Sequence, residues 1–111
     1  MKEWIKITTE EELYTLIEKS TIKPQIIFKH SVTCGISAYA KEKLTNGFDL
    51  LEGKADFYYL DLLSYRPVSN LIAQVTGVTH QSPQIIVLKD KTAVYQVSHH
   101  AIEAGKIAAV L

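Results

Sequence analysis

Cys34, the single cysteine of the chain, is the residue best suited to covalent chemistry. Its neighbours Ser31, Thr33 and Ser37 are polar, and it stands where an apolar run gives way to a helical pattern. Thr33 is the predicted N-cap, which would make Cys34 the first helical residue. Free backbone N–H groups and the positive end of a helix favour a thiolate, the form that attacks disulfides. This setting favours a redox-active thiol, although a lone cysteine is more often a small buried hydrophobe.

Ser37 occupies the position at which a C-x-x-C pair would carry its second cysteine. A hydroxyl there can hydrogen-bond a thiolate but cannot form a disulfide. Such a site therefore acts through an intermolecular mixed disulfide, which a second thiol from solution resolves. The alternative for Ser37 is an ordinary exposed polar residue in the first helical turn.

Short strand-like runs alternate with helical patterns along the chain. The predicted strands cover residues 4–7, 25–28, 57–60, 84–88 and 93–97. The predicted helices begin after the Thr9–Glu12 capping-box pair, at Cys34, near Pro67 and at about Ser98. Asn46-Gly47 and Gly77 are the predicted ends of the second and third helices.

The resulting order, β-α-β-α-β-α-β-β-α, determines the predicted fold. Helices separate the first three strands, which implies right-handed parallel crossovers. A tight polar turn at 89–91 joins the last two strands as an antiparallel hairpin. We therefore expect one α/β domain over residues 1–111, with a central mixed sheet and helices on both faces. This is the order of the thioredoxin-like fold.

Ser82 and Pro83 form a second candidate part of the site. Pro83 stands between the 77–81 loop and the predicted strand 84–88. In thioredoxin-like proteins a cis-proline loop lies beside the active cysteine and offers the backbone of the preceding residue to a disulfide. The order of elements thus favours a cis Ser82–Pro83 bond, against the alternative of an ordinary trans proline that begins a strand.

Three segments of the chain resemble the monothiol bacilliredoxins, the YtxJ-like group of thioredoxin-fold proteins. They read FKHSVTCGISA at 28–38, GVTHQSPQ at 77–84 and SHHAI at 98–102. The family motif reads Thr-Cys-Pro-Ile-Ser, and the resemblance covers essentially the whole chain.

This resemblance implies removal of bacillithiol from protein cysteines that it has capped. Bacillithiol replaces glutathione in many low-GC Gram-positive bacteria. It would be a co-substrate, and no tightly bound cofactor is expected. The implied partners are S-bacillithiolated client proteins and a low-molecular-weight thiol, and the expected state is a monomer or weak dimer. Cys34 would be the catalytic nucleophile, with active-site support from Thr33, Gly35, Ser37, Ser82 and Pro83.

The carboxylates on the malyl group of bacillithiol need cationic or N–H partners. The candidates are Lys29 and the predicted start of the last helix, namely Ser98, His99 and His100. A helix turn that simply faces water is the alternative for the two histidines. His30 is a further candidate for binding the thiol; it would either steady the thiolate or cap the strand end, and His80 is predicted to be structural. No three histidines have metal-site spacing, so no metal is predicted.

Gly35 replaces the proline of the family motif. The resulting Cys-Gly-Ile-Ser is close to the Cys-Gly-Phe-Ser of monothiol glutaredoxins, some of which share an iron–sulfur cluster between two subunits. The glycine-rich glutathione site of those proteins is missing, and residues 98–100 take its place. Two alternatives therefore stay open: a glutaredoxin-like iron–sulfur or thiol-binding module, and a non-catalytic thioredoxin-like interaction domain.

Composition limits the remaining function classes. Twelve basic residues balance twelve acidic ones, without a run of Lys or Arg, so no nucleic-acid or anionic-membrane partner is expected. No apolar run approaches the roughly 18 residues of a membrane helix. Residues 1–12 lack the apolar core of a signal peptide, so we expect a cytoplasmic protein, a compartment that suits a single cysteine.

Overall fold

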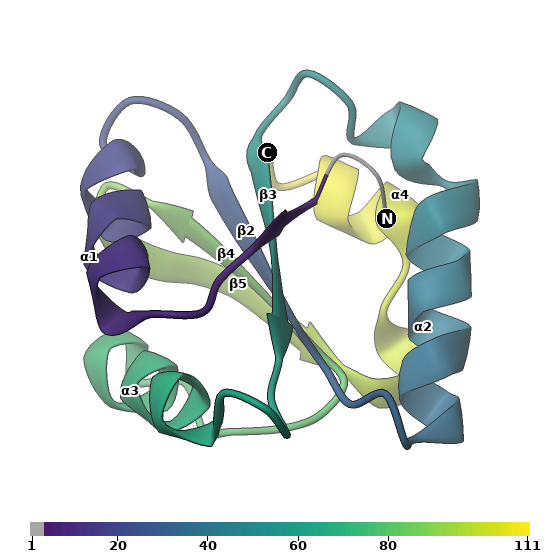
Figure 1. The fold of residues 1–111 in the computed structure, drawn as a ribbon. Coiled ribbons are helices and arrows are strands. Elements are labelled where there is room, and N and C mark those ends of the chain that lie inside the picture. Colours follow the sequence, from purple (N-terminus) through teal and green to yellow (C-terminus); the bar gives the residue numbers. More distant parts are fainter. Residues whose placement is uncertain (1–3) are drawn as a thin grey trace.

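The computed structural model describes residues 4–111, in which one five-stranded sheet carries helices on both faces (Figure 1). The strands are β1 (Ile5–Lys6), β2 (Gln25–His30), β3 (Asp56–Asp61), β4 (Gln84–Lys89) and β5 (Thr92–Ser98). Their order in the sheet is β1-β3-β2-β4-β5. β1, β3 and β2 are parallel, whereas β4 and β5 are antiparallel to their neighbours. The mixed sheet predicted from the order of elements is confirmed.

Local signals place α1 and α3 at the predicted points. The helices are α1 (Glu10–Lys19), α2 (Gly35–Asn46), α3 (Arg66–Thr76) and α4 (Ala104–Ala108), with 3-10 turns η1 (Phe48–Leu50) and η2 (His99–Ala101). The Thr9 hydroxyl accepts the Glu12 N–H at 3.1 Å, and the Glu12 carboxylate accepts the Thr9 N–H at 3.1 Å, which completes the capping box. Gly77 ends α3 with a φ of 72°, a left-handed conformation that glycine adopts without steric cost.

The helices form two layers around the sheet. α1 and α3 cover one face, and α2 and α4 cover the other (Figure 1). Because side chains alternate along a strand, β2 contributes to both cores: Phe28 packs on the α2 side and Ile27 on the α1–α3 side. All six residues of β2 are buried, as the continuous apolar run at 25–28 predicted for a central strand.

The last helical region is shorter than predicted. The sequence placed a helix from about Ser98 to the end, but residues 99–101 form only a 3-10 turn and α4 begins at Ala104. His99 has a φ of 56°, which a right-handed helix cannot contain. Its N–H donates to the Pro83 carbonyl at 2.9 Å, which continues the pairing of β5 with β4 by one residue beyond Ser98.

Gly47, the C-cap of α2, packs closely against the start of α4. A Cβ at Gly47 would lie 2.6 Å from the Cβ of Ala104, and neither group can move aside as a flexible side chain does. We expect Gly47→Ala to lower the free energy of unfolding by about 1–3 kcal/mol through overpacking, measured by urea denaturation. Ala104→Gly should recover part of this loss in the double variant.

Gly105→Ala is the matched control, because a Cβ at that position meets nothing within 4 Å. This substitution should be neutral or stabilising by up to about 1 kcal/mol, since alanine favours a helix over glycine. Additive effects of Gly47→Ala and Ala104→Gly would contradict the contact.

Candidate functional site

Cys34 lies just beyond the carboxyl end of the central strand β2 and is the N-cap of α2. Its backbone is extended, with φ −104° and ψ 123°, and its carbonyl accepts the Ala38 N–H at 3.0 Å. The residue is half-buried and has no disulfide partner. An N-cap side chain lies next to the free N–H groups of the first helical turn. Cys34 therefore sits at an accessible helix start rather than within a core.

The predicted N-cap, Thr33, is wrong by one residue. The first helical backbone bond starts at the Cys34 carbonyl, so Cys34 itself takes the capping position. The Thr33 hydroxyl instead lies 3.2 Å from the Ser31 hydroxyl, within the loop. Thr33 thus contributes to the shape of the loop and not to the helix cap.

Ser37 is fully buried, contrary to the alternative of an exposed polar residue. Its Oγ accepts the Ser31 N–H at 3.0 Å and lies 2.7 Å from His30 Nδ1. The structure shows no hydrogen bond between Ser37 and Cys34 within residues 4–111. The hydroxyl at the position of a second cysteine therefore anchors the loop that carries Cys34.

His30, the last residue of β2, is the second partner in this anchor. Its ring is buried between Phe28 and Tyr59, with 5.4 Å between ring centroids in each case. Burial lowers the pKa of His30; the charge of Lys41 lowers it further and that of Asp61 opposes the shift. A neutral ring can accept the Ser37 O–H at Nδ1. These contacts favour the strand-end role of His30 over direct contact with the sulfur.

The Ser82–Pro83 bond is cis, as the order of elements favoured. Gln84 of β4 pairs with Lys29 of β2 in antiparallel register. Continuing that register past the ladder brings Pro83 beside the end of β2, where the Cys34 loop begins. The Ser82 hydroxyl is buried there without a hydrogen-bond partner among residues 4–111. The predicted proline-led loop and the cysteine therefore share one edge of the sheet.

Lys29 is fully buried, so its predicted contact with ligand carboxylates does not fit the structure. Because strand side chains alternate, Lys29 points to the α1–α3 face, opposite to His30 and α2. Its Nζ donates to the Ser69 carbonyl at 3.2 Å and lies 3.3 Å from His80 Nδ1. Burial lowers the pKa of Lys29 to about 8. Lys29 instead ties α3 and the loop before Pro83 to the sheet, which agrees with the structural role predicted for His80.

Ser98, His99 and His100 lie beside the proline loop but do not begin a helix. The Pro83 carbonyl accepts the His99 N–H, and the His100 carbonyl accepts a hydrogen bond from Lys43 of α2 at 3.1 Å. Both histidines are exposed. The expected anion site at a helix N-terminus is therefore wrong, whereas a contact through the imidazole side chains stays a prediction.

Gly35 is the first residue of α2, and a Cβ there would meet nothing within 4 Å. Proline is well accepted at this helical position, and Cys34 already has the extended backbone that a residue before proline adopts. The loop therefore accommodates glycine and the family proline with the same backbone.

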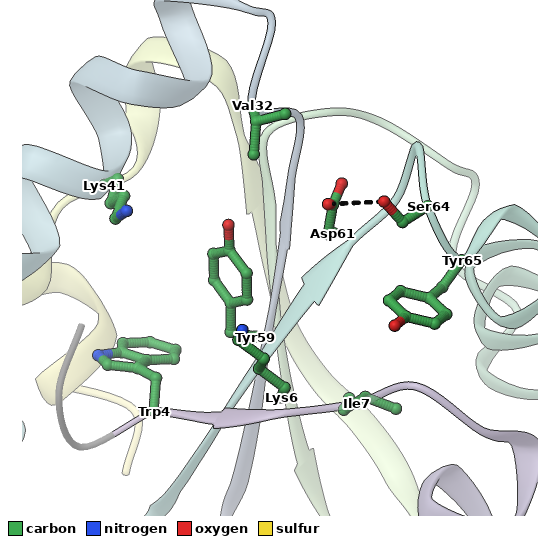
Figure 2. A pocket seen from close by; sticks show the side chains of 9 residues that line it. All are labelled: Trp4, Lys6, Ile7, Val32, Lys41, Tyr59, Asp61, Ser64 and Tyr65. Carbon is green, nitrogen blue, oxygen red and sulfur yellow. Dashed lines mark hydrogen bonds between the residues drawn. The ribbon is translucent and has the colours of Figure 1, made fainter.

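A pocket of about 450 Å³ opens beside the loop on its β3 side, and sequence reasoning missed it (Figure 2). It is lined by Trp4, Lys6, Ile7, Val32, Lys41, Tyr59, Asp61, Ser64 and Tyr65. These residues come from separate parts of the chain that only the parallel pairing of β1 with β3 and the placement of α2 bring together. No local motif marks them.

Within residues 4–111, no cluster of three or more His, Cys, Asp or Glu side chains could hold a metal ion. In the same residues no helix is both long enough and apolar enough to span a membrane.

Comparison with known proteins identifies the fold. A thioredoxin from Trypanosoma brucei brucei superposes with a TM-score of 0.75 at 11% identity, covering 96% of this chain and 85% of that one. A Fasciola hepatica thioredoxin gives 0.72 at 16% identity, covering 96% and 94%. A solved protein described provisionally as an oxidoreductase with a thioredoxin fold gives 0.84 at 31% identity, covering 97% and 93%. The predicted thioredoxin-like fold is confirmed.

The fold and the accessible cysteine beside a cis-proline define a thioredoxin-fold thiol oxidoreductase. The sequence model of one family, described as monothiol bacilliredoxin BrxC, matches residues 5–107. The chain belongs to the monothiol bacilliredoxin family, as the three matching segments predicted.

Removal of the Ser37 hydroxyl should loosen the loop. Ser37→Ala leaves the buried Ser31 N–H and His30 Nδ1 without their shared partner, so we expect a loss of about 1–3 kcal/mol in the free energy of unfolding. Thr33→Val, which removes only the part-buried contact of the exposed Thr33 side chain with the Ser31 hydroxyl, is the control and should change stability less than Ser37→Ala does. Equal stability of Ser37→Ala and wild type in urea denaturation would contradict the anchor.

The buried ammonium of Lys29 should make stability depend on pH. With a folded pKa of about 8 and an ordinary value of 10.5, the unfolded chain binds more protons between these limits. The free energy of unfolding therefore rises with pH in this window, by at most about 1.4 kcal/mol per pH unit from this group. Lys29→Met removes that rise, so its stability difference from wild type should change between pH 8 and about 9.5.

Urea denaturation across this range measures the difference. It stays below the pH at which Tyr58 and Tyr59 titrate, because burial raises the pKa of both phenols above 10. Lys54→Met, at an exposed lysine, is the matched control and should show no such change. Parallel pH profiles for wild type and Lys29→Met would exclude a depressed pKa at Lys29.

Proposed function

We propose that this protein removes bacillithiol from S-bacillithiolated protein cysteines through a mixed disulfide on Cys34. The observation that carries the proposal is the pairing of one accessible cysteine at a helix N-cap with a buried serine three residues later. A cysteine so placed can attack a disulfide but has no neighbour with which to close one. Membership of the monothiol bacilliredoxin family supports the choice of thiol.

The first step exchanges one disulfide for another. The Cys34 thiolate attacks the bacillithiol sulfur of the capped client, the client S–S bond breaks, and the client sulfur leaves as a thiolate that takes up a proton. Cys34 now carries the bacillithiol as a mixed disulfide. No net oxidation or reduction has occurred, because one S–S bond has replaced another.

A second thiol completes the cycle. A low-molecular-weight thiol, such as a further bacillithiol, attacks the adduct as its thiolate, frees Cys34 and leaves as a disulfide of the two small thiols. Because Ser37 is held by Ser31 and His30, it does not take part in this step. A reducing compartment with free thiol, the cytoplasm, would supply this reactant.

The surroundings of Cys34 support client docking. The cis-proline loop lies at the same sheet edge, where the backbone of Ser82 would pair with an extended client segment. Ile36, two residues after Cys34, is an exposed apolar side chain and would extend that contact. Thr33 and Gly35, on either side of Cys34, are both exposed.

Intact-mass spectrometry tests the proposal. After mixing with a bacillithiol-capped client protein, the wild type should gain the mass of one bacillithiol on Cys34 while the client loses it. Cys34→Ala should gain nothing, since it lacks the nucleophile. Alkylation of Cys34 by a neutral reagent serves as the control for thiol access. A client that stays capped while Cys34 is readily alkylated would show that the protein does not accept this substrate.

A further inference from the structure

The pocket beside the active-site loop combines positive charge with aromatic walls. Lys6 of β1 and Lys41 of α2 line it from two sides, and neither forms an ion pair with a carboxylate of residues 4–111. Figure 2 shows the Tyr59 ring standing between Lys41 and Asp61, with its hydroxyl directed toward Val32. The Trp4 ring forms part of the wall below it. Such a cavity suits a small anion with a polar body.

The pocket wall also carries an unpaired acceptor. One carboxylate oxygen of Asp61 accepts the Ser64 hydroxyl at 2.9 Å (Figure 2). Its other oxygen, Oδ1, is buried and has no donor among residues 4–111. A buried acceptor without a donor costs free energy. A hydroxyl or amino group of a bound molecule would supply the missing donor.

The geometry of α2 connects this pocket to the sulfur. Cys34, Ala38 and Lys41 are spaced i, i+4 and i+7, so they share one side of the helix. Lys41 lies roughly 10 Å along the axis from Cys34, and Ala38 between them is small and exposed. Val32, two residues before Cys34, lines the pocket directly. A molecule attached to Cys34 can therefore extend past Ala38 into the pocket.

We propose that this pocket binds the carboxylate-bearing body of the low-molecular-weight thiol while its sulfur is bonded to Cys34, an inference that rests on the proposed function. Lys6 and Lys41 would bind the carboxylates, the rings of Trp4 and Tyr59 would pack on the body, and Asp61 would accept from its hydroxyl or amino groups. The pocket volume of about 450 Å³ falls within the range of about 300–1,000 Å³ that is typical of small-molecule sites.

This position differs from the one predicted from the sequence. The sheet order β1-β3-β2-β4-β5 puts the pocket, at β1 and β3, on one side of β2. Ser98, His99 and His100 follow β5 and lie on the other side, next to Pro83. The proposal therefore places the thiol body on the β3 side and leaves the proline side to the client.

The kinetic test compares one peptide carrying two different caps. The peptide is capped either with bacillithiol or with 2-mercaptoethanol, which has no carboxylate, and transfer to Cys34 is followed by mass spectrometry. In the Lys6→Gln/Lys41→Gln variant, the ratio of the bacillithiol rate to the mercaptoethanol rate should fall at least about fivefold from the wild-type ratio. Lys54→Gln removes one positive charge at an exposed site near the start of β3, away from the pocket, and it should keep the wild-type ratio.

A binding test avoids catalysis altogether. Trp4 is the only tryptophan of the chain and lines the pocket, so its fluorescence reports on occupancy. S-methylated bacillithiol should change this fluorescence in a Cys34→Ser protein and in the same protein carrying Lys54→Gln. When Lys6→Gln and Lys41→Gln are added, the apparent affinity obtained from this fluorescence change should fall at least about fivefold.

The outcomes distinguish a failure of the pocket proposal from a failure of the proposed function. Transfer of bacillithiol by the wild type with an unchanged rate ratio in Lys6→Gln/Lys41→Gln would overturn the pocket and leave the proposed function standing. A loss of selectivity in His99→Asn/His100→Asn instead would move the thiol body to the proline side. No bacillithiol transfer by the wild type, with normal transfer of mercaptoethanol, would overturn the proposed function itself.

Discussion

The pairing of β2 on both its edges is the constraint on which the site depends. β2 runs parallel to β3 and antiparallel to β4, and all six of its residues are buried. The carboxyl ends of β2 and β3 therefore meet the amino end of β4 at one edge of the sheet. The Cys34 loop follows β2, Asp61 ends β3, and the Ser82–Pro83 bond precedes β4, so all three lie at this edge. A slip in the β2–β4 register would separate the sulfur from the proline loop, and a slip in the β2–β3 register would move Asp61 away from the end of β2.

The serine at position 37 has a positive structural role in addition to the chemistry that it excludes. A buried hydroxyl needs partners, and Ser37 has two of them: the N–H of Ser31 and the ring of His30. The contact spans the loop from its first residue to the first turn of α2. It holds Cys34 at the N-cap while leaving the sulfur without an intramolecular partner. Loop rigidity and single-thiol chemistry thus come from the same side chain.

Because side chains alternate between the two faces of the sheet along β2, its two adjacent polar residues have different structural roles. His30 faces α2 and anchors the cysteine loop, whereas Lys29 faces α3 and holds His80 and the Ser69 carbonyl. Both groups are buried, and burial disfavours their charged forms. Neither is available to a ligand. Lys6 of β1 and Lys41 of α2 line the pocket and bring positive charge to it.

The sequence by itself determined the order of elements, the parallel crossovers, the capping box at Thr9, the central position of β2 and the candidate cysteine. These features follow from local chemistry and from hydrophobic spacing, so residues close together in the sequence are enough to predict them. Family membership was also predictable from the sequence, because three short segments match the family.

Only the tertiary structure decided which polar side chains face the sulfur, the core or a cavity. Lys29 and Ser37 look like surface residues in the sequence, yet both are fully buried because a strand and a helix bring partners from elsewhere. The expected helix at Ser98 gave way to pairing of His99 with Pro83. The pocket formed by Lys6, Lys41 and Asp61 joins segments far apart in the chain. Such contacts depend on strand register and helix placement, which no local pattern contains.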